Sequence, residues 1–314
     1  MSPAPVVSRA DVVLARRLLG DQVRRTPLLA AEAGSLAEVP VSLKLELLQH
    51  TGSFKVRGAL TALLATEPPR PEAGVVAASG GNHGLAVAWA ARRVGTPATV
   101  FVPQTAPDTK VAGLRALGAD VRQVGTRYAE ALAAAREHAL ATGADAVHAY
   151  DEPAVVAGQG TLALELLEDL PEVDTVLVAV GGGGLAGGIA TALDGRAHVV
   201  GVEPEGCPTW HAARAAGEPV DVEVGGPAAD SLGATRLGDI AFGALTRARA
   251  DSLVVPAGAV QEARRLLWQR FRLAVEPGAA VAAAALTTGG YRPRRGERVA
   301  VVVCGGNADP ADVA

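Results

Sequence analysis

Valine-rich runs without charge alternate with longer stretches of helical spacing along most of this chain. Val75–Ser79, Thr175–Val180 and Val299–Cys304 are runs of this kind, and none of them alternates apolar with polar residues. Strands of such composition are buried on both faces, which is typical of parallel sheets covered by helices. The sequence therefore predicts an α/β fold, with further strands at Thr99–Val102, Val121–Gly125, Val147–Tyr150, His198–Glu203 and Leu253–Pro256.

The stretches between these strands predict helices from the spacing of their apolar residues. A chain of 314 residues is long for one domain, and so we expect two lobes. The proline-rich segment Glu67–Pro71 indicates a break, which places a smaller domain at residues 73–149 and a larger one at residues 1–72 and 150–314. The predicted helices are Asp11–Leu19, Phe54–Ala65, Gly84–Val94, Asp108–Leu117, Tyr128–Thr142, Val155–Leu170, Leu185–Leu193, Val260–Arg272 and Ala279–Thr288.

The composition argues against several classes of protein. The net charge is −4, whereas a protein that binds nucleic acid usually carries a basic excess. The two cysteines, Cys207 and Cys304, cannot build a disulfide framework, which fits a reducing cytoplasm. Residues 175–193 carry no charge and have the length of a membrane span, but glycines interrupt them. We therefore expect a strand, a loop and a helix there, and no contact with a membrane.

Four consecutive glycines follow the strand that ends at Val180 and precede an alanine-rich helix. Glycine lets the backbone approach an anion closely, and a helix N-terminus adds positive potential, so the tract predicts a phosphate site. Gly182, Gly184 and Gly187 also match the G-x-G-x-x-G pattern of dinucleotide enzymes, with Glu203 where a ribose-binding acid would lie. An NAD-dependent oxidoreductase is therefore an alternative at this point.

Lysine is scarce in this chain: of 29 basic residues, the lysines are Lys44, Lys55 and Lys110. Arginine stays protonated, so these residues are the candidates for a neutral amine. Lys55 follows the segment Thr51–Phe54, which predicts a turn with Ser53 as the N-cap of a helix. In the first turn of that helix the dipole favours the uncharged amine, which Schiff-base chemistry requires. Lys110 is interpreted as a surface residue.

Two further loops follow predicted strands. The loop from Ser79 to His83 opens a helix, and its backbone N–H groups, the Ser79 hydroxyl and the Asn82 amide are suited to hold a carboxylate. His83 is interpreted as a structural or orienting residue. Cys304 lies at the carboxyl end of the last strand, where ligands of parallel sheets gather.

In combination these segments resemble the pyridoxal-phosphate-dependent enzymes of fold type II, the tryptophan synthase β-like family, and within it the serine/threonine dehydratase branch related to serine racemases. The resemblance runs from about Arg25 to Asp309. It implies a two-lobed fold in which each lobe is a mostly parallel sheet flanked by helices, with pyridoxal 5'-phosphate as cofactor, in a cytoplasmic homodimer. An NAD-dependent oxidoreductase does not need a reactive lysine such as Lys55, so the resemblance argues against that alternative. The matching segments are Thr51–Gly58, Ser79–His83, Ala157–Thr161, Gly181–Leu185 and Cys304–Asn307.

The resemblance implies a role for each matching residue. Lys55 is the catalytic lysine that carries the cofactor, and Phe54 packs near the cofactor ring. Asn82 bonds the 3-oxygen of the ring, and Ser79, Asn82 and His83 hold the substrate carboxylate. The cofactor phosphate is bound by Gly181, Gly182, Gly183, Gly184 and Leu185.

Cys304 faces the pyridine nitrogen by the same resemblance. Other pyridoxal enzymes place an aspartate there, which keeps the nitrogen protonated and makes the ring a strong electron sink. A thiol cannot do so, and this favours β-elimination over transamination.

The chain departs from the racemases at several positions. Gly80 stands where they have a second serine, the base on the opposite face of the ring, and Tyr150 stands where they have an asparagine. Both differences favour dehydration over racemisation. Glu203 and the carbonyl of Cys207 match two ligands of a divalent-cation site, but Thr209 replaces the acidic third ligand. We therefore expect no metal, with Glu203 capping the end of its strand, and a divalent cation bound at Glu203 is the alternative.

The implied activity is that of a lyase for a small amino acid. The resemblance implies dehydration and deamination of L-threonine or L-serine to a 2-oxo acid and ammonia, with Lys55 removing the Cα proton. A serine racemase and an ammonia-lyase for another β-substituted amino acid are the alternatives within the family. The segment Ala229–Gly233 is expected to help close the pocket.

Overall fold

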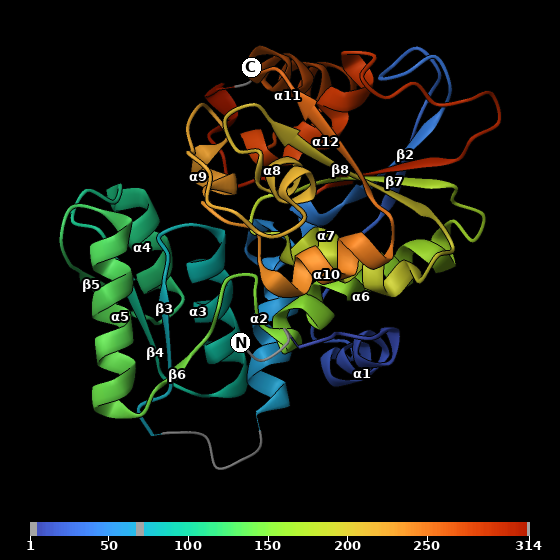
Figure 1. Cartoon of the computed structure of the whole chain (residues 1–314). Helices are drawn as coiled ribbons and strands as arrows, with labels where there is room; N and C mark the ends of the chain where they lie inside the picture. Colours follow the sequence, from blue (N-terminus) through green and yellow to red (C-terminus); the bar gives the residue numbers. More distant parts are fainter. Residues whose placement is uncertain (1–4, 67–71, 313–314) are drawn as a thin grey trace.

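The computed structural model describes residues 5–66 and 72–312, and its strands form two separate sheets (Figure 1). The larger sheet contains β1 (Leu28–Ala31), β2 (Val41–Leu45), β7 (Thr175–Ala179), β8 (His198–Pro204), β9 (Asp251–Val255) and β10 (Val299–Val303). Their order in the sheet is β1-β2-β10-β7-β8-β9, and every neighbouring pair is parallel except β1 and β2.

The smaller sheet lies within residues 75–146. It contains β3 (Val75–Ala78), β4 (Ala98–Val102), β5 (Asp120–Gln123) and β6 (Asp145–Ala146). The order is β5-β4-β3-β6, and all of its pairs are parallel. The two sheets and the helices beside them confirm the predicted α/β fold with two lobes.

Helices cover both sheets. In the larger lobe, α12 (Pro277–Thr287) packs on one face of the sheet and α7 (Gly184–Leu193) on the other (Figure 1). The remaining helices are α1 (Arg9–Leu19), α2 (Lys55–Ala65), α3 (Asn82–Val94), α4 (Asp108–Ala116), α5 (Tyr128–Thr142), α6 (Pro153–Asp169), α8 (Thr209–Ala216), α9 (Ala229–Leu232), α10 (Asp239–Arg247) and α11 (Ala257–Phe271), with 3-10 turns at Glu46–Leu48, His50–Gly52 and Pro310–Asp312.

The helix that begins at Lys55 lies between the two lobes. One side of α2 packs against α6 of the larger lobe, and another packs against α3 of the smaller lobe. Its apolar residues Leu60 and Leu63 share a buried cluster with Val100 of the smaller sheet. Burial of these side chains holds the helix in place through the hydrophobic effect, and this places Lys55 where the lobes meet.

Most predicted elements are confirmed within one to three residues, but the strand predicted at Val147–Tyr150 is wrong. The last strand of that sheet is Asp145–Ala146, and after a bond from the Val147 N–H to the Val76 carbonyl the chain turns away. Tyr150 packs instead against the glycine loop. Five elements were not predicted from the sequence: β1, β2, α8, α9 and α10. The predicted break at Glu67–Pro71 lies outside the described residues.

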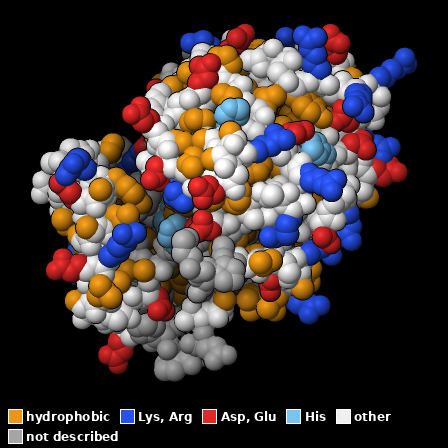
Figure 2. All heavy atoms as spheres, in the orientation of Figure 1, with side chains coloured by type: hydrophobic (Ala, Val, Ile, Leu, Met, Phe, Trp, Pro, Cys, Tyr) orange, Lys and Arg blue, Asp and Glu red, His pale blue; other side chains and the backbone are white. Residues whose placement is uncertain are grey.

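The uncharged stretch at residues 175–193 forms β7, a loop and α7, as expected. Among the described residues, no helix combines the length and the apolar character needed to cross a bilayer. Charged side chains of both signs are interspersed over the face drawn in Figure 2. The carboxyl ends of β10, β7 and β8 lie side by side in the larger sheet, and they lead to Cys304, to the four glycines and to Glu203 at the end of β8.

Candidate active site

Lys55 is the first residue of α2, and its side chain reaches toward the chain that follows the smaller sheet. The Nζ atom donates a hydrogen bond to the Ala149 carbonyl at 2.8 Å. Burial lowers the pKa of Lys55 to about 8, partly opposed by Cys304 and Glu276. The expected shift toward the free amine is therefore present, with burial as its main cause. The predicted N-cap is wrong, because Phe54 precedes the helix and no side chain caps it.

Cys304 follows β10 directly and is buried, with 4% of its surface exposed. Burial raises the pKa of its thiol far above the usual range, and the nearby Glu276 carboxylate raises it further, so the thiol stays neutral. The Phe54 N–H donates to the Cys304 carbonyl at 3.1 Å, and Ser53 pairs with Gly305. The backbone thus joins the segment that carries the lysine directly to the segment that carries the thiol.

The loop from Ser79 to His83 joins β3 to α3, as predicted. The Gly81 N–H donates to the Ser79 hydroxyl at 3.2 Å, and the helix begins at Asn82 without a side-chain cap. The first N–H groups of such a helix are free to bind an anion. His83 is buried, and its Nε2 lies 2.9 Å from the Val147 carbonyl oxygen. Burial lowers the pKa of His83 to about 3, so the ring is neutral and held by backbone.

Glu276 is a residue of this site that the sequence analysis missed. The Asn82 Nδ2 lies 2.8 and 2.9 Å from the two carboxylate oxygens of Glu276. Asn307 donates to the Asn82 Oδ1 at 2.7 Å and to the Thr51 carbonyl at the same distance. Burial raises the pKa of Glu276 to about 7. The predicted bond from Asn82 to a cofactor oxygen stays a prediction, and here the Asn82 side chain is held from both ends by the larger lobe.

The four glycines form the turn between β7 and α7. Gly183 has a φ of 88°, which favours glycine, and the helix begins at Gly184. A Cβ atom on Gly182 would lie 2.2 Å from the Tyr150 ring, so only glycine allows this packing. The Ala149 carbonyl accepts the hydrogen bond from Lys55, and the next residue, Tyr150, packs against the glycine turn. The four glycines and Lys55 therefore share one site.

Glu203 ends β8 and has its carboxylate surrounded by donors. It accepts from the Trp210 N–H and the His211 N–H, each at 2.8 Å, and its Oε1 atom lies 2.9 Å from the Thr209 hydroxyl oxygen. Burial raises the pKa of Glu203 to about 7. In the described part of the chain, no group of three or more histidine, cysteine, aspartate or glutamate residues is placed to hold a metal ion. The hydrogen bonds from the Trp210 and His211 N–H groups show that Glu203 caps the start of α8.

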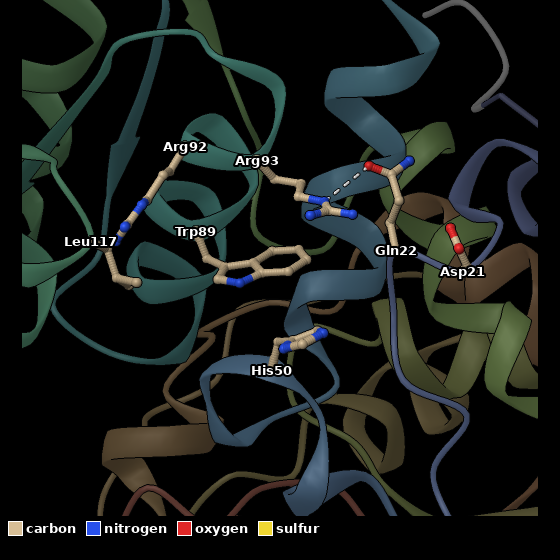
Figure 3. A pocket seen from close by; sticks show the side chains of 7 residues that line it. All are labelled: Asp21, Gln22, His50, Trp89, Arg92, Arg93 and Leu117. Atoms are coloured by element: carbon tan, nitrogen blue, oxygen red, sulfur yellow. Dashed lines mark hydrogen bonds between the residues drawn. The ribbon is translucent and has the colours of Figure 1, made fainter.

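A cavity of about 550 Å³ lies elsewhere, and none of the predicted site residues lines it. Figure 3 shows the His50 ring beside the Trp89 ring, and the two stack with their centroids 4.7 Å apart. Arg93 donates to the Gln22 side chain at 3.3 Å on the same wall. This cavity is separate from the cluster around Lys55.

The site therefore combines an enclosed amine, a neutral thiol, a glycine turn at a helix N-terminus and a second helix N-terminus. A family model described as "Pyridoxal-phosphate dependent enzyme" matches residues 19–305. The chain belongs to this family. The match decides against the dinucleotide alternative and confirms pyridoxal phosphate as the cofactor of this enzyme.

This pyridoxal-phosphate enzyme is similar to proteins of known name over nearly its whole length. It is 37% identical over 310 residues to an L-threonine ammonia-lyase of Thermotoga maritima, covering 97% of this chain and 76% of that protein. It is 39% identical to a threonine deaminase of known structure from T.th., with a TM-score of 0.88 and coverage of 96% and 99%. Maize serine racemase superposes with a TM-score of 0.92 at 29% identity, over 97% of this chain and 95% of that one.

The residues present in this pyridoxal-phosphate enzyme fit the cofactor. Two buried hydroxyls in the turn that precedes Lys55, Thr51 Oγ1 and Ser53 Oγ, have no hydrogen-bond partner within the described residues. The glycine turn leaves the first N–H groups of α7 for a phosphate. Lys55 has the lowered pKa that reaction with an aldehyde needs, and the neutral Cys304 thiol adds no charge beside a pyridine ring.

Proposed function

We propose that this enzyme dehydrates and deaminates L-threonine or L-serine, and releases a 2-oxo acid and ammonia. The observation that carries the proposal is the enclosed Lys55 amine beside a neutral Cys304 thiol. The names of the relatives, a threonine ammonia-lyase and a threonine deaminase, support the same substrate class.

When bound, pyridoxal phosphate withdraws electrons from the Cα atom of the amino acid. We assign the phosphate to the turn Gly181–Gly184 and Leu185, and the ring to the space beside Phe54 and Cys304. The Lys55 Nζ would accept the Cα proton, because its lowered pKa keeps part of the amine free near neutral pH. The β-hydroxyl would then leave as water with a proton from the Lys55 Nζ or the cofactor phosphate, and hydrolysis of the released enamine would give the 2-oxo acid and ammonia.

The carboxylate of the substrate amino acid needs a binding site, and we place that site in the smaller lobe. We assign this to the start of α3, where Ser79, Asn82 and His83 lie together. The N–H groups there offer positive potential to a carboxylate. A carboxylate bound at this point would connect the smaller lobe to an amino acid held over Lys55.

A direct test is to replace the lysine. Lys55→Ala should abolish ammonia release from threonine and serine and remove the visible absorbance of the bound cofactor. Lys110→Ala, at a half-buried lysine of α4, should keep that absorbance. Borohydride reduction followed by peptide mapping should place the cofactor on Lys55, and a label on another residue would overturn the assignment.

Racemisation is the rival activity suggested by the likeness to maize serine racemase. Gly80 favours elimination, because it offers no side-chain base on the opposite face of the amino acid. Chiral analysis of residual serine after partial turnover should show L-serine and pyruvate without D-serine. Accumulation of D-serine faster than pyruvate would contradict the proposal.

We further propose a homodimer in the cytoplasm, with residues 73–149 as the smaller domain and residues 1–72 and 150–314 as the larger one. The two unpaired cysteines support a reducing compartment. Light scattering after gel filtration should give twice the chain mass of 31.7 kDa. A monomer at micromolar concentration would contradict the dimer.

A further inference from the structure

Thr209 lies behind the glycine turn and touches it through its side chain. It is the first residue of α8 and is fully buried. Its Oγ1 atom lies 2.6 Å from the Gly181 carbonyl oxygen and 2.9 Å from the Glu203 Oε1. The Thr209 hydroxyl has a single proton to donate. The Gly181 carbonyl oxygen can only accept and is the nearer of the two partners, so the hydroxyl donates to it.

The carbonyl groups of the first three glycines are each held by a donor. Gly181 receives the Thr209 hydroxyl, Gly182 receives the Gly238 N–H at 3.1 Å, and Gly183 receives the Gly187 N–H at 2.8 Å. The donors at Gly182 and Gly183 are backbone groups. At Gly181 the donor is a side chain, so this bond can be removed without changing the backbone.

A held carbonyl also sets the direction of the next N–H group. In a planar trans peptide the C=O of one residue and the N–H of the following residue point in opposite directions. The bond from Thr209 to Gly181 therefore turns the N–H of Gly182 away from α8. Glycine has the widest range of backbone conformations, so without that bond this peptide plane would be free to rotate.

We propose that Thr209 is a positioning residue of the phosphate-binding loop, whose hydroxyl orients the Gly181–Gly182 peptide so that the Gly182 N–H faces the cofactor phosphate. This inference rests on the assignment of the phosphate to the glycine turn. Thr209 itself touches no part of the cofactor. The fixed start of α8 supports the role, since Glu203 holds the next two N–H groups of the helix.

The test uses pyridoxine 5'-phosphate, which carries the phosphate but no aldehyde, so that binding does not depend on the reaction with Lys55. Its dissociation constant from the apoenzyme is measured by fluorescence quenching. Thr209→Val should raise this constant about tenfold, the size of effect expected for one lost hydrogen bond. Thr209→Ser keeps the hydroxyl and should stay within about twofold of the parent enzyme.

Two comparisons separate positioning from a general loss of structure. Thr191 of α7 has a buried hydroxyl without a partner in the described residues, so Thr191→Val should leave the affinity unchanged. Binding of unphosphorylated pyridoxal should be the same in Thr209→Val and the parent. Equal weakening of both ligands, or no weakening of the phosphorylated one, would overturn the inference.

A further variant distinguishes a wrong role for Thr209 from a wrong assignment of the phosphate to the glycine turn. Gly183→Ala puts a Cβ atom 2.5 Å from the Ala241 Cβ and strains a φ of 88°, so it should distort the turn. If it weakens pyridoxine 5'-phosphate binding while Thr209→Val does not, the assignment of the phosphate stands and the role of Thr209 is wrong. If neither variant weakens binding, the phosphate lies elsewhere. If Gly183→Ala does not fold, Gly181→Ala takes its place in the test, because its Cβ atom would lie 3.2 Å from the Leu232 side chain.

Discussion

Two ionisable residues of the site have pKa values that burial shifts toward each other. The pKa of Lys55 is lowered to about 8, and the pKa of Glu276 is raised to about 7. At neutral pH both forms of each group are populated, although a free lysine would be almost fully charged and a free glutamate almost fully ionised. Groups with such shifts are typical of sites where protons move.

The lowered pKa of Lys55 predicts how the apoenzyme takes up its cofactor. Only the neutral amine attacks an aldehyde, so the rate of pyridoxal-phosphate attachment should rise about fivefold from pH 7 to pH 8 and level off above about pH 9. Stopped-flow absorbance measures this rate. Glu276→Gln removes a negative charge that raises the lysine pKa, and should move the midpoint to lower pH. A midpoint near 10.5 would contradict the burial of the amine.

Cys304 allows a second prediction at this scale. Cys304→Asp would place an ionisable group beside the pyridine ring, and should favour transamination over elimination. We expect ammonia release to fall at least tenfold, with more pyridoxamine phosphate formed per ammonia. Cys304→Ser should keep elimination within a few fold. An aspartate variant that eliminates as fast as the parent would show that the residue does not face the ring.

The sequence indicated several of these residues because local chemistry marks them. A lysine at a predicted helix start and four consecutive glycines are visible without a structure. Glu276 was missed because its partner, Asn82, is 194 residues away in the chain. A signal was present, since Glu276 stands just before Pro277 at the start of a helix that carries no charge of its own.

At the scale of elements, a buried ionic cluster ties β2, α2 and α6 together. Arg57 donates to both oxygens of Glu46 at 2.8 Å and to Glu165 at 2.7 Å. Lys44 donates to the other oxygen of Glu165 at 2.8 Å. Arg57 lies two residues after Lys55, so the cluster anchors the helix that begins at Lys55.

Breaking this cluster should destabilise the protein strongly. Arg57→Met leaves the buried carboxylates of Glu46 and Glu165 without their guanidinium, and should lower the free energy of unfolding by about 3–5 kcal/mol. Guanidinium-induced unfolding of the apoenzyme measures the change. Arg298→Met removes an exposed pair with Glu172 and should cost less than about 1 kcal/mol. Equal losses in the two variants would contradict the role of the cluster.

The same cluster explains why β2 was missed. Lys44 lies in the strand and is fully buried, and Ser42 interrupts the apolar run. A charged residue inside a strand argues against burial unless a partner is known, and Glu165 comes from a helix 121 residues later. The valine-rich strands β3, β7, β8 and β10 could be predicted because their own residues account for their burial.

At the scale of the whole molecule, one ion pair crosses between the lobes. Lys110 of α4 lies 2.8 Å from both carboxylate oxygens of Asp230 of α9. Among the ion pairs of the described residues, it is the one that joins residues 75–146 to the rest. The neighbouring Ser231 accepts the Gly278 N–H at 3.0 Å, so the same segment also reaches the helix that follows Glu276. Lys110, interpreted from the sequence as a surface residue, is therefore an interlobe contact.

This pair predicts a charge-dependent step in substrate binding. Lys110→Asp should raise the KM for the amino acid about two- to fivefold and leave kcat unchanged, because exposed pairs contribute below about 1 kcal/mol. The double variant Lys110→Asp with Asp230→Lys should restore the KM. High salt should reduce the difference, since it screens exposed charges. A double variant worse than either single one would show that the pair does not act across the lobes.

The backbone hydrogen bond between Phe54 and Cys304 has a consequence for how such an enzyme could change its substrate preference. The segments that carry the amine and the thiol, the groups assigned to the two ends of the cofactor ring, are joined directly by backbone pairing and not through the smaller sheet. Changes in the smaller lobe can therefore alter which amino acid is accepted without disturbing the reactive pair. Directed evolution toward a new substrate would do best to begin with the residues around Ser79 and α4.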